Sequence, residues 1–331
     1  MTTPICVLGG GAMGTACACV LAENPQHDVR LWARNPTFAS HIAETRFNSR
    51  LLPGIRISDS ITVTSDQSQA LADAEMVVVC IPTRSLTDAL TPMAQSIAAD
   101  AIVVSAVKGI EAETLTRPSE LIENVIGQRA IVAFGGPCHA EEVANGKPAS
   151  VVAAGTDKRA AQRVQQAFAT DSLRVYTNAD LAGVELAGAF KNVMAIAAGI
   201  CDGLEYGDNA RSALMTRGLA EMVRFGTALG AQTDTFFGLA GIGDLIGTCG
   251  SPHSRNRHVG ERLGRGESLE DIRQSMQAVA EGVFTAQSVR RLAEERSLDL
   301  PIATEVYRVL FEDHSPREAT LRLMRRPLKG E

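Results

Sequence analysis

The chain lacks several features that would each indicate a distinct class of protein. It has no excess of positive charge, because 32 lysines and arginines face 38 aspartates and glutamates for a net charge of −6. This balance argues against nucleic acid as a bulk electrostatic partner. No apolar run approaches the roughly 20 residues that a membrane span needs. The amino terminus, MTTPICVLGG, lacks a basic segment and continues into a strand-like run, so it does not resemble a signal peptide.

Cysteine is present but is not grouped. The seven cysteines are scattered along the chain, without a CxxC motif or a Cys/His cluster of zinc-ligand spacing. We therefore expect a reduced, cytoplasmic protein without a structural metal. The length of 331 residues is long for one hydrophobic core, so two domains are the default expectation.

A glycine-rich turn near the amino terminus predicts a dinucleotide-binding site. A short apolar run over residues 4–8 leads into Gly9, Gly11 and Gly14, which have GxGxxG spacing, and then into an alanine-rich helix over 15–22. The first glycine permits a tight turn, the second lets the backbone approach a pyrophosphate, and the third lets helix and strand pack closely. The amino end of the helix then offers amide donors and a positive dipole end to the phosphates.

The residues after the second predicted strand, 28–33, indicate which cofactor is used. NAD-specific proteins place an acidic residue there to bind the ribose 2′-hydroxyl. This chain has Arg34 and Asn35 instead. A guanidinium can pair with a 2′-phosphate through two hydrogen bonds, so we expect NADP(H) as the preferred cofactor, with NAD(H) also used. The competing interpretation is a solvated arginine after a strand.

Strand-like and helical segments alternate through the first half of the chain, which predicts a doubly wound (Rossmann-type) parallel sheet. The further strands are expected at 61–64, 75–81, 101–106, 130–134, 150–154 and 173–177. From Leu181 onward the periodicity is helical to the end. We therefore predict an NAD(P)-binding domain over residues 1–179 and an all-helical substrate and catalytic domain over 180–331.

Two strand ends in the first half carry candidate ligand-binding groups. Lys108 follows the strand 101–106, where a cation could contact substrate or cofactor oxygens; a surface loop lysine is the alternative. The turn GGPCHAEE, residues 135–142, places glycine and proline before a helix with two acids in its first turn. Its exposed amides could bind an anion.

The most informative segment is VELAGAFKNVMAIAA, residues 184–198. It is apolar on all sides, which is typical of a buried helix, yet it contains Glu185, Lys191 and Asn192. A lysine in a buried helix is costly unless it has a partner or a function, and burial lowers an amine's pKa toward the range useful for proton transfer. The alternative is a lysine whose stem lies on apolar surface while its amine reaches water.

The helical half contains two further candidate sites. The stretch GLAGIGDLIG, residues 238–247, is dense in glycine around Asp244, which favours close backbone approach to a ligand; an irregular loop with Asp244 as a helix N-cap is the alternative. Ser254, Arg255 and Asn256 open a predicted helix that runs to about residue 263. Neutral donors, a guanidinium and a helix dipole together suit a phosphate, although a serine N-cap with exposed arginines would give the same pattern.

Over its full length the chain resembles the bacterial-type NAD(P)-dependent glycerol-3-phosphate dehydrogenases. The resemblance is densest in GVELAGAFKNVMAIAAGICDG, DNARSALMTRGLAEM, GLAGIGDL and SPHSRN. It implies that Lys191 is the proton donor and acceptor at the substrate's C2 oxygen. It implies a substrate-binding set of Lys108, Gly136, Cys138, Lys191, Asp244, Ser254, Arg255 and Asn256. It implies a cofactor-binding set of Gly9, Gly11, Ala12, Met13, Gly14, Arg34, Lys108, Ala140, Arg255, Val279 and Glu281.

The resemblance also implies a reaction and a setting. The enzyme would interconvert dihydroxyacetone phosphate and sn-glycerol 3-phosphate, and so supply glycerol 3-phosphate for phospholipid synthesis in the cytoplasm. The sequence does not determine the oligomeric state, for which a homodimer is one hypothesis. The chain departs from the family pattern at three places: Cys138-His139 replaces Ser or Thr followed by Phe, Glu205-Tyr206 replaces a Leu-Gly-like pair, and Ala12 replaces a common Ser.

Two alternative functions remain open from the sequence. The first is another two-domain β-hydroxyacid or ketopantoate-type reductase, which shares the Rossmann domain, the helical domain and a Lys–Asn pair. Its carboxylate substrates would not need the Ser-Arg-Asn anion site. The second is a non-catalytic module that senses NADPH, which would need the glycine turn and Arg34 but not Lys191.

Overall fold

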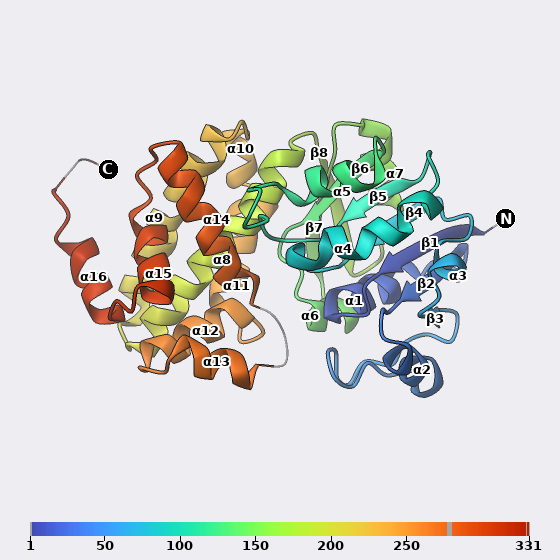
Figure 1. The fold of residues 1–331 in the computed structure, drawn as a ribbon, viewed down its shortest axis with the longest axis horizontal. Coiled ribbons are helices and arrows are strands. Elements are labelled where there is room, and N and C mark those ends of the chain that lie inside the picture. The colour runs from blue at the N-terminus through green and yellow to red at the C-terminus, as the bar shows by residue number, and fades with distance from the viewer. Residues whose placement is uncertain (1, 277–279, 329, 331) are drawn as a thin grey trace. The chain divides into compact units, whose positions relative to one another are not determined.

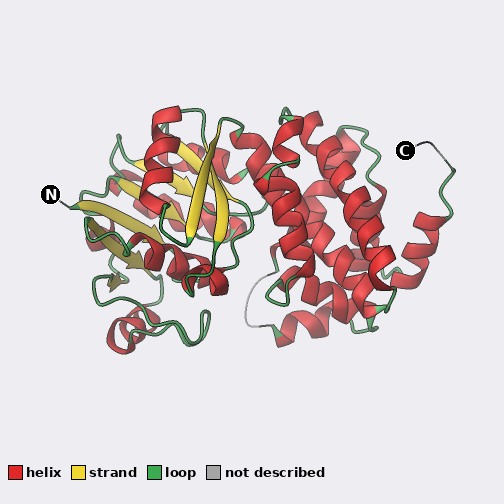
Figure 2. Cartoon of the chain, turned by 180° about the vertical axis from the view of Figure 1, so that it is seen from behind, coloured by secondary structure: helices red, strands yellow, loops and turns green. Residues whose placement is uncertain are grey.

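The computed structural model describes residues 2–276, 280–328 and 330. The chain divides into two compact units: Met1–Lys108 with Thr116–Glu185, and Gly109–Leu115 with Leu186–Glu331. The strands, yellow in Figure 2, belong to the first unit, and the second unit is built from helices. The second division, between Glu185 and Leu186, lies inside the long helix α8 (Leu181–Gly203).

The first unit is built on an eight-stranded sheet. Its strands are β1 (Thr3–Leu8), β2 (His27–Trp32), β3 (Thr62–Thr64), β4 (Met76–Val79), β5 (Ile102–Ser105), β6 (Ala130–Gly135), β7 (Ala149–Ala154) and β8 (Leu173–Asn178). Their spatial order is β3-β2-β1-β4-β5-β6-β7-β8, and Figure 1 labels them. The first six strands have the 3-2-1-4-5-6 order of a Rossmann fold, which confirms the predicted fold class.

One neighbouring pair of strands departs from the predicted parallel arrangement. β6 and β7 are antiparallel, whereas β7 and β8 are parallel to each other. The connection from β6 to β7 contains only the five-residue helix α6 (Ala140–Ala144). Such a helix is about 7.5 Å long, too short to return the chain along a six-residue strand of about 20 Å. The chain therefore reverses direction at this edge of the sheet.

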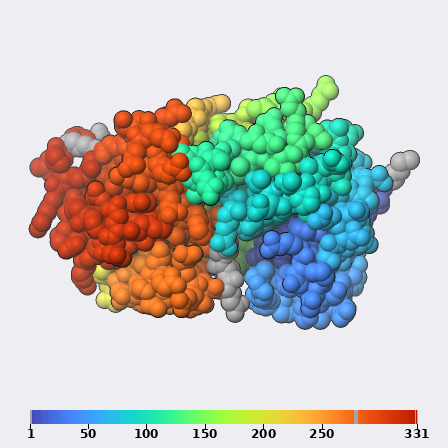
Figure 3. Space-filling view, viewed as in Figure 1, coloured from blue at the N-terminus to red at the C-terminus, as the bar shows by residue number. Residues whose placement is uncertain are grey.

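Helices cover both faces of the sheet. Successive side chains of a strand point to opposite faces, and on each face they form an apolar cluster that the helices bury. In β4, Val78 packs into one cluster with residues of α1 (Ala12–Leu21) and α7 (Lys158–Phe168). Val77 packs into the other cluster with residues of α3 (Gln67–Leu71), α4 (Leu86–Leu90) and α5 (Pro118–Ile126). In Figure 3 the part of the chain that contains α4 and α5, coloured teal to green, lies on the outside of this unit. The other helical elements of this unit are α2 (Pro36–Thr45), η1 (Thr83–Ser85) and η2 (Thr91–Ser96).

The second unit is formed around α8 (Leu181–Gly203), which begins in the first unit. The other elements are α9 (Gly207–Ala228), α10 (Thr233–Phe236), the π-helical turn η3 (Leu239–Gly243), α11 (Asp244–Gly250), α12 (Arg255–Gly264), α13 (Leu269–Ser275), α14 (Glu281–Glu295), α15 (Pro301–Phe311) and α16 (Pro316–Met324). Every residue from 183 to 200 is buried, which confirms the predicted buried helix. Residues 239–247 are helical and Asp244 is the first residue of α11, so the alternative of an irregular loop with Asp244 as the N-cap is wrong.

Glycine lets α8 and α12 pack with their backbones in contact. A Cβ added at Gly199 would lie 1.9 Å from the Arg257 carbonyl oxygen, and one at Gly260 would lie 2.0 Å from the Ile196 carbonyl oxygen. Any larger residue would force the two helices apart. This contact places the amino end of α12 beside the middle of α8.

Candidate functional site

The glycine turn between β1 and α1 has the geometry that a pyrophosphate requires. Gly9 has φ +120°, and a Cβ there would lie 2.7 Å from the Cys80 carbonyl oxygen. A Cβ at Gly14 would lie 1.8 Å from the Gly9 carbonyl oxygen, so α1 packs directly on the turn. A Cβ at Gly11 would meet nothing within 4 Å. The backbone at Gly11 is therefore open to an approaching ligand, as the second glycine of the motif should be.

The helix α1 begins at Ala12, three residues earlier than the sequence predicted. Gly11 is its extended N-cap and provides no side-chain cap. Ala12, Met13 and Gly14 thus form the first turn, whose amides have no partner within the helix. This first turn fits an anion such as a pyrophosphate.

Arg34 lies two residues beyond the end of β2 and is exposed. Asn35 beside it accepts a hydrogen bond from the Phe38 amide (2.9 Å) and caps α2, so its side chain is engaged in the fold. No acidic residue occupies the end of β2. The local chemistry fits the 2′-phosphate of NADP(H) better than the free ribose hydroxyl of NAD(H).

Lys108, Gly136 and Cys138 come together at the carboxyl ends of β5 and β6. The Lys108 amine donates to the Gly136 carbonyl oxygen (3.1 Å) and lies 3.8 Å from the Cys138 sulfur. The Cys138 thiol donates to the same carbonyl (3.2 Å). Gly136 has φ +117°, and a Cβ there would lie 3.2 Å from the Val151 Cα. Ala140 is the first residue of α6 and is buried.

In the helical unit, Lys191 lies in a buried cluster with Asp244 and Thr248. The Lys191 amine is 2.7 Å from Asp244 Oδ1 and 2.5 Å from Thr248 Oγ1. The Thr248 hydroxyl also donates to Asp244 Oδ1 (3.2 Å). The side chains of Lys191 and Asp244 are 5% and 3% exposed, so the ion pair is largely removed from water. Lys191 therefore does not simply extend its amine into bulk solvent, which was the alternative from the sequence.

The Ser-Arg-Asn segment opens α12 as predicted. Ser254 is the N-cap and accepts a hydrogen bond from the Arg257 amide (3.2 Å), whereas Arg255 is exposed. Asn256 is buried, and its Oδ1 accepts from the Gly282 amide (2.9 Å). A Cβ at Gly282 would lie 2.6 Å from the Asn192 carbonyl oxygen, so Gly282 is sandwiched between Asn256 and Asn192. The candidate anion site is thereby tied to the helix turn that carries Lys191.

The structure describes one of the two cofactor residues, Val279 and Glu281, that were predicted for this part of the sequence. Glu281 is the first residue of α14 and is half-buried. Val279 lies outside the described residues.

Several polar residues that were given no role in the site from the sequence help to build it; of these, only Asp202 stood out in the sequence, as a polar residue in apolar surroundings. Thr248 is four residues after Asp244 on α11. This i,i+4 spacing puts both side chains on one face of the helix, and it is the sequence pattern that could have identified Thr248. Asp202, near the end of α8, accepts a hydrogen bond from Arg257 Nε (2.7 Å) and so ties α12 to α8. Asn48 contacts the glycine turn from a distant loop, and no sequence pattern points to it.

Glu185 proves to have a structural role near the start of α5. Its carboxylate accepts hydrogen bonds from the Ser119 amide (2.7 Å), the Ser119 hydroxyl (2.6 Å) and Arg117 Nη1 (2.8 Å). Burial raises the pKa of Glu185, although Arg117 and Ser119 oppose this shift. The carboxylate thus supplies the cap that α5 lacks from its own N-cap side chain.

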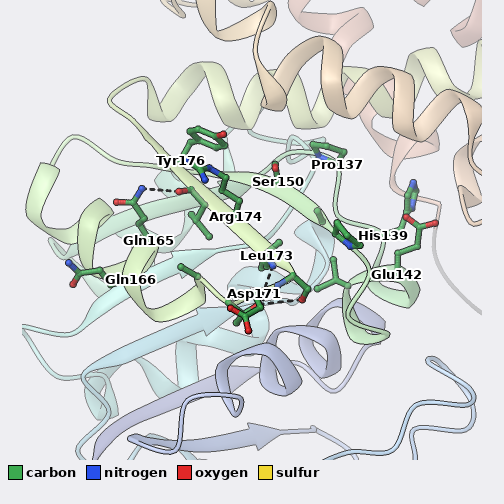
Figure 4. Close-up of a pocket in the computed structure, with 17 residues that line it drawn as sticks. Pro137, His139, Glu142, Ser150, Gln165, Gln166, Asp171, Leu173, Arg174 and Tyr176 are labelled. Atoms are coloured by element: carbon green, nitrogen blue, oxygen red, sulfur yellow. Dashed lines mark hydrogen bonds between the residues drawn. The ribbon is translucent and has the colours of Figure 1, made fainter.

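A groove of about 840 Å³ lies on the first unit beside β7, β8, α6 and α7 (Figure 4). Its labelled polar residues include His139, Glu142, Gln165 and Arg174. None of the predicted cofactor or substrate residues lines it. The groove is therefore separate from the sites built by the glycine turn and by Lys108.

The described residues contain no group of three or more His, Cys, Asp or Glu side chains placed to bind a metal ion. Among the same residues one helix, α8, is long and apolar enough to cross a bilayer, with a mean hydropathy of 1.4. However, 94% of that apolar window is buried inside the protein. Its position is that of a core helix.

Comparisons with known proteins agree with this architecture. The family model for the NAD-dependent glycerol-3-phosphate dehydrogenase N-terminus matches residues 4–161, and the corresponding C-terminus model matches residues 180–321. A relative from Citrifermentans bemidjiense, glycerol-3-phosphate dehydrogenase (NAD(P)+), is 45% identical over 334 residues, covering 100% of this chain and 99% of the relative. A relative of the same name from Chlorobium limicola is 46% identical over 330 residues, covering 99% of each chain. The crystal structure of glycerol-3-phosphate dehydrogenase from Coxiella burnetii is 34% identical, with a TM-score of 0.94 and coverage of 98% of this chain and 99% of that one.

Proposed function

Because the chain belongs to the family of NAD-dependent glycerol-3-phosphate dehydrogenases, we propose that it interconverts dihydroxyacetone phosphate and sn-glycerol 3-phosphate with NADP(H) or NAD(H). The observation that carries the proposal is the buried cluster of Lys191, Asp244 and Thr248. A desolvated amine with a carboxylate and a hydroxyl is suited to move a proton to and from an alcohol oxygen. Residues 1–179 would bind the cofactor, and residues 180–331 would bind the substrate and supply the proton.

The cofactor-binding assignment rests on the glycine turn and on Arg34. The open backbone at Gly11 and the first turn of α1, with Ala12 and Met13, would face the pyrophosphate. Arg34 would pair with the 2′-phosphate, which favours NADP(H) over NAD(H). Further contacts are assigned to Gly9, Gly14, Lys108, Ala140, Arg255, Val279 and Glu281.

Lys191 is assigned the proton transfer. When bound, the nicotinamide cofactor supplies the hydride to the substrate's C2 carbon or accepts it in the reverse direction. In the reduction, the Lys191 ammonium donates a proton to the C2 oxygen; in the oxidation, the neutral amine accepts the hydroxyl proton. Asp244 and Thr248 fix the direction of the amine, because both lie within hydrogen-bond distance of it. A fixed amine loses little orientational freedom when the substrate binds.

The phosphate of the substrate is assigned to the amino end of α12. Ser254, Arg255 and Asn256 supply a hydroxyl, a guanidinium and an amide there, and the helix dipole favours an anion. Lys108, Gly136 and Cys138 are assigned to the remaining substrate contacts. A thiol donates more weakly than the hydroxyl that the family usually has at position 138, so this chain should bind the triose less tightly at that point.

One assay separates this proposal from its alternatives. Purified protein is given dihydroxyacetone phosphate, 2-oxo acids or 3-oxo acids with NADPH and with NADH, and absorbance at the nicotinamide band is followed. We expect turnover with the phosphorylated triose alone. Turnover with an unphosphorylated oxo acid would instead favour a β-hydroxyacid or ketopantoate-type reductase, and tight NADPH binding without turnover would favour a sensing module.

The setting of the enzyme is also part of the proposal. The apolar helix α8 is buried, and no other helix among the described residues has the length and composition of a membrane span. We assign the protein to the cytoplasm, where it would supply glycerol 3-phosphate for phospholipid synthesis. A homodimer is proposed as the assembly, and light scattering during size-exclusion chromatography tests it.

A further inference from the structure

Asn48 is a fully buried polar side chain that the proposed mechanism does not use. It lies in the loop between α2 and β3 and is 0% exposed. Its Nδ2 donates to the Gly10 carbonyl oxygen (3.0 Å) and to Thr15 Oγ1 (2.8 Å). Its Oδ1 accepts from the Leu51 amide (3.2 Å) within its own loop. The amide therefore joins this loop both to the glycine turn and to α1.

The two contacts lie on either side of the amino end of α1. Gly10 precedes the helix, and Thr15 is the fourth residue within it. The first-turn amides assigned to the pyrophosphate, those of Ala12, Met13 and Gly14, lie between them in the chain. A side chain that spans this segment fixes the direction in which those amides point.

The glycine turn needs such a restraint from outside. Residues 9–11 are three consecutive glycines, and glycine loses more backbone freedom on ordering than any other residue. Gly11, as the N-cap of α1, has no side chain with which to hold the turn. Asn48 provides a fixed donor to the middle glycine, which no residue of the turn itself can supply.

The loop that carries Asn48 is itself firmly held. Ile57 and Ile61 are 0% exposed and pack into the same apolar cluster as residues of α1. Arg46 Nη1 donates to the Ile61 carbonyl oxygen (2.8 Å), and the Ile57 amide donates to the Arg46 carbonyl oxygen (2.8 Å). The position of Asn48 is therefore set by packing and hydrogen bonds that do not involve the glycine turn.

We propose that Asn48 is a positioning residue for the dinucleotide, which acts by holding the phosphate-binding turn in its binding geometry before the cofactor arrives. This inference rests on the proposed function, since it takes the glycine turn as the cofactor site. It predicts that loss of the amide weakens binding of NADPH and NADH together, because both share the pyrophosphate. The turnover number at saturating cofactor and the KM for dihydroxyacetone phosphate change little.

The test measures the Kd for NADPH by its fluorescence on binding, together with steady-state kinetics. Each lost orienting hydrogen bond should cost about a factor of 3 to 10, so Asn48→Ala, which loses both, should raise the Kd about 10- to 100-fold. Thr15→Val, which removes one of the two acceptors, should raise it about 3- to 10-fold. Thr15→Ser keeps the hydroxyl and should bind NADPH within about 2-fold of the native protein.

Ile57→Val is the matched control for a loosened loop. It removes one buried methyl group from the loop, at a cost of about 1 kcal/mol, without touching Gly10 or Thr15. The control should leave the Kd for NADPH unchanged. An equal rise of the Kd in Ile57→Val, or an unchanged Kd in Asn48→Ala, would overturn the inference.

The outcome also separates this inference from the proposed function. Absence of triose phosphate reduction by a native protein that binds NADPH contradicts the function, whereas the Kd values still test Asn48. Normal turnover with an unchanged Kd in Asn48→Ala contradicts only the inference. A native protein that binds neither NADPH nor NADH contradicts both.

Discussion

Glu221 gives the helical unit a stability that depends on pH. This residue of α9 is buried, and its carboxylate accepts hydrogen bonds from the Ile302 amide (2.7 Å) and the Ala303 amide (3.1 Å). It thereby caps the amino end of α15, whose own N-cap has no side-chain hydrogen bond. Burial nevertheless raises the pKa of Glu221 from 4.5 to about 7, and the two amides and Arg224 only partly oppose this shift.

The size and sign of the effect follow from this difference in pKa. Well below pH 4.5 the carboxyl is protonated in both the folded and the unfolded chain, so it does not lower the free energy of unfolding. As the pH rises from about 4.5 to about 7, the unfolded chain releases the proton first, and the folded state loses stability. A difference of about 2.5 pH units corresponds to about 3 kcal/mol in the free energy of unfolding. Well above pH 7 both states are deprotonated, and this loss in the free energy of unfolding no longer changes with pH.

The variant Glu221→Gln isolates this contribution, because an amide of the same shape does not titrate. Urea unfolding is followed by far-UV circular dichroism, since the single tryptophan, Trp32, lies in the other unit. The free energy of unfolding of Glu221→Gln minus that of the native protein should rise by about 2.5 kcal/mol between pH 5 and pH 8, because a small part of the total change already occurs below pH 5. Parallel pH profiles for the two proteins would refute the reasoning, because all other titrating groups cancel in the difference.

Three further substitutions test separate parts of the molecule. Arg34→Ala should raise the KM for NADPH about 10- to 100-fold, the value of a charge-assisted hydrogen bond, and leave the KM for NADH within about 3-fold; equal changes for both cofactors would contradict its assignment to the 2′-phosphate. Cys138→Ser should lower the KM for dihydroxyacetone phosphate, because a hydroxyl donates better than a thiol; a higher KM would exclude that contact. Glu205→Gly should stabilise the protein by about 0.5 kcal/mol in thermal unfolding, because Glu205 has φ +58°; a lower melting temperature would show that its side chain contributes a contact.

The fold was largely predictable because the sequences of its core elements are uninterrupted apolar runs. Strands buried on both faces, such as residues 76–79, contain only apolar residues, and α8 is apolar on all sides. The reversal at β7 was not predictable from composition, because a strand looks the same in either direction. It depended on the length of α6, and short helices are difficult to locate from sequence.

The candidate site was predictable where one residue type carries the chemistry, as with Lys191 and the glycine turn. It was not predictable where a function depends on partners that are distant in sequence. Asn48 meets Gly10 across 38 residues, and Lys191 meets Thr248 across 57. Neither contact leaves a local pattern, because the fold alone brings the two residues together.

The most direct test of the proposed function is the turnover of Lys191→Ala with dihydroxyacetone phosphate and saturating NADPH. The amine is buried between Asp244 and Thr248, so water cannot readily replace it as the proton donor. We expect the turnover number to fall by at least about 100-fold, the usual contribution of a general acid, while the Kd for NADPH stays within about 3-fold of the native value. Turnover close to that of the native enzyme, with the fold intact by circular dichroism, would contradict the assignment of proton transfer to Lys191.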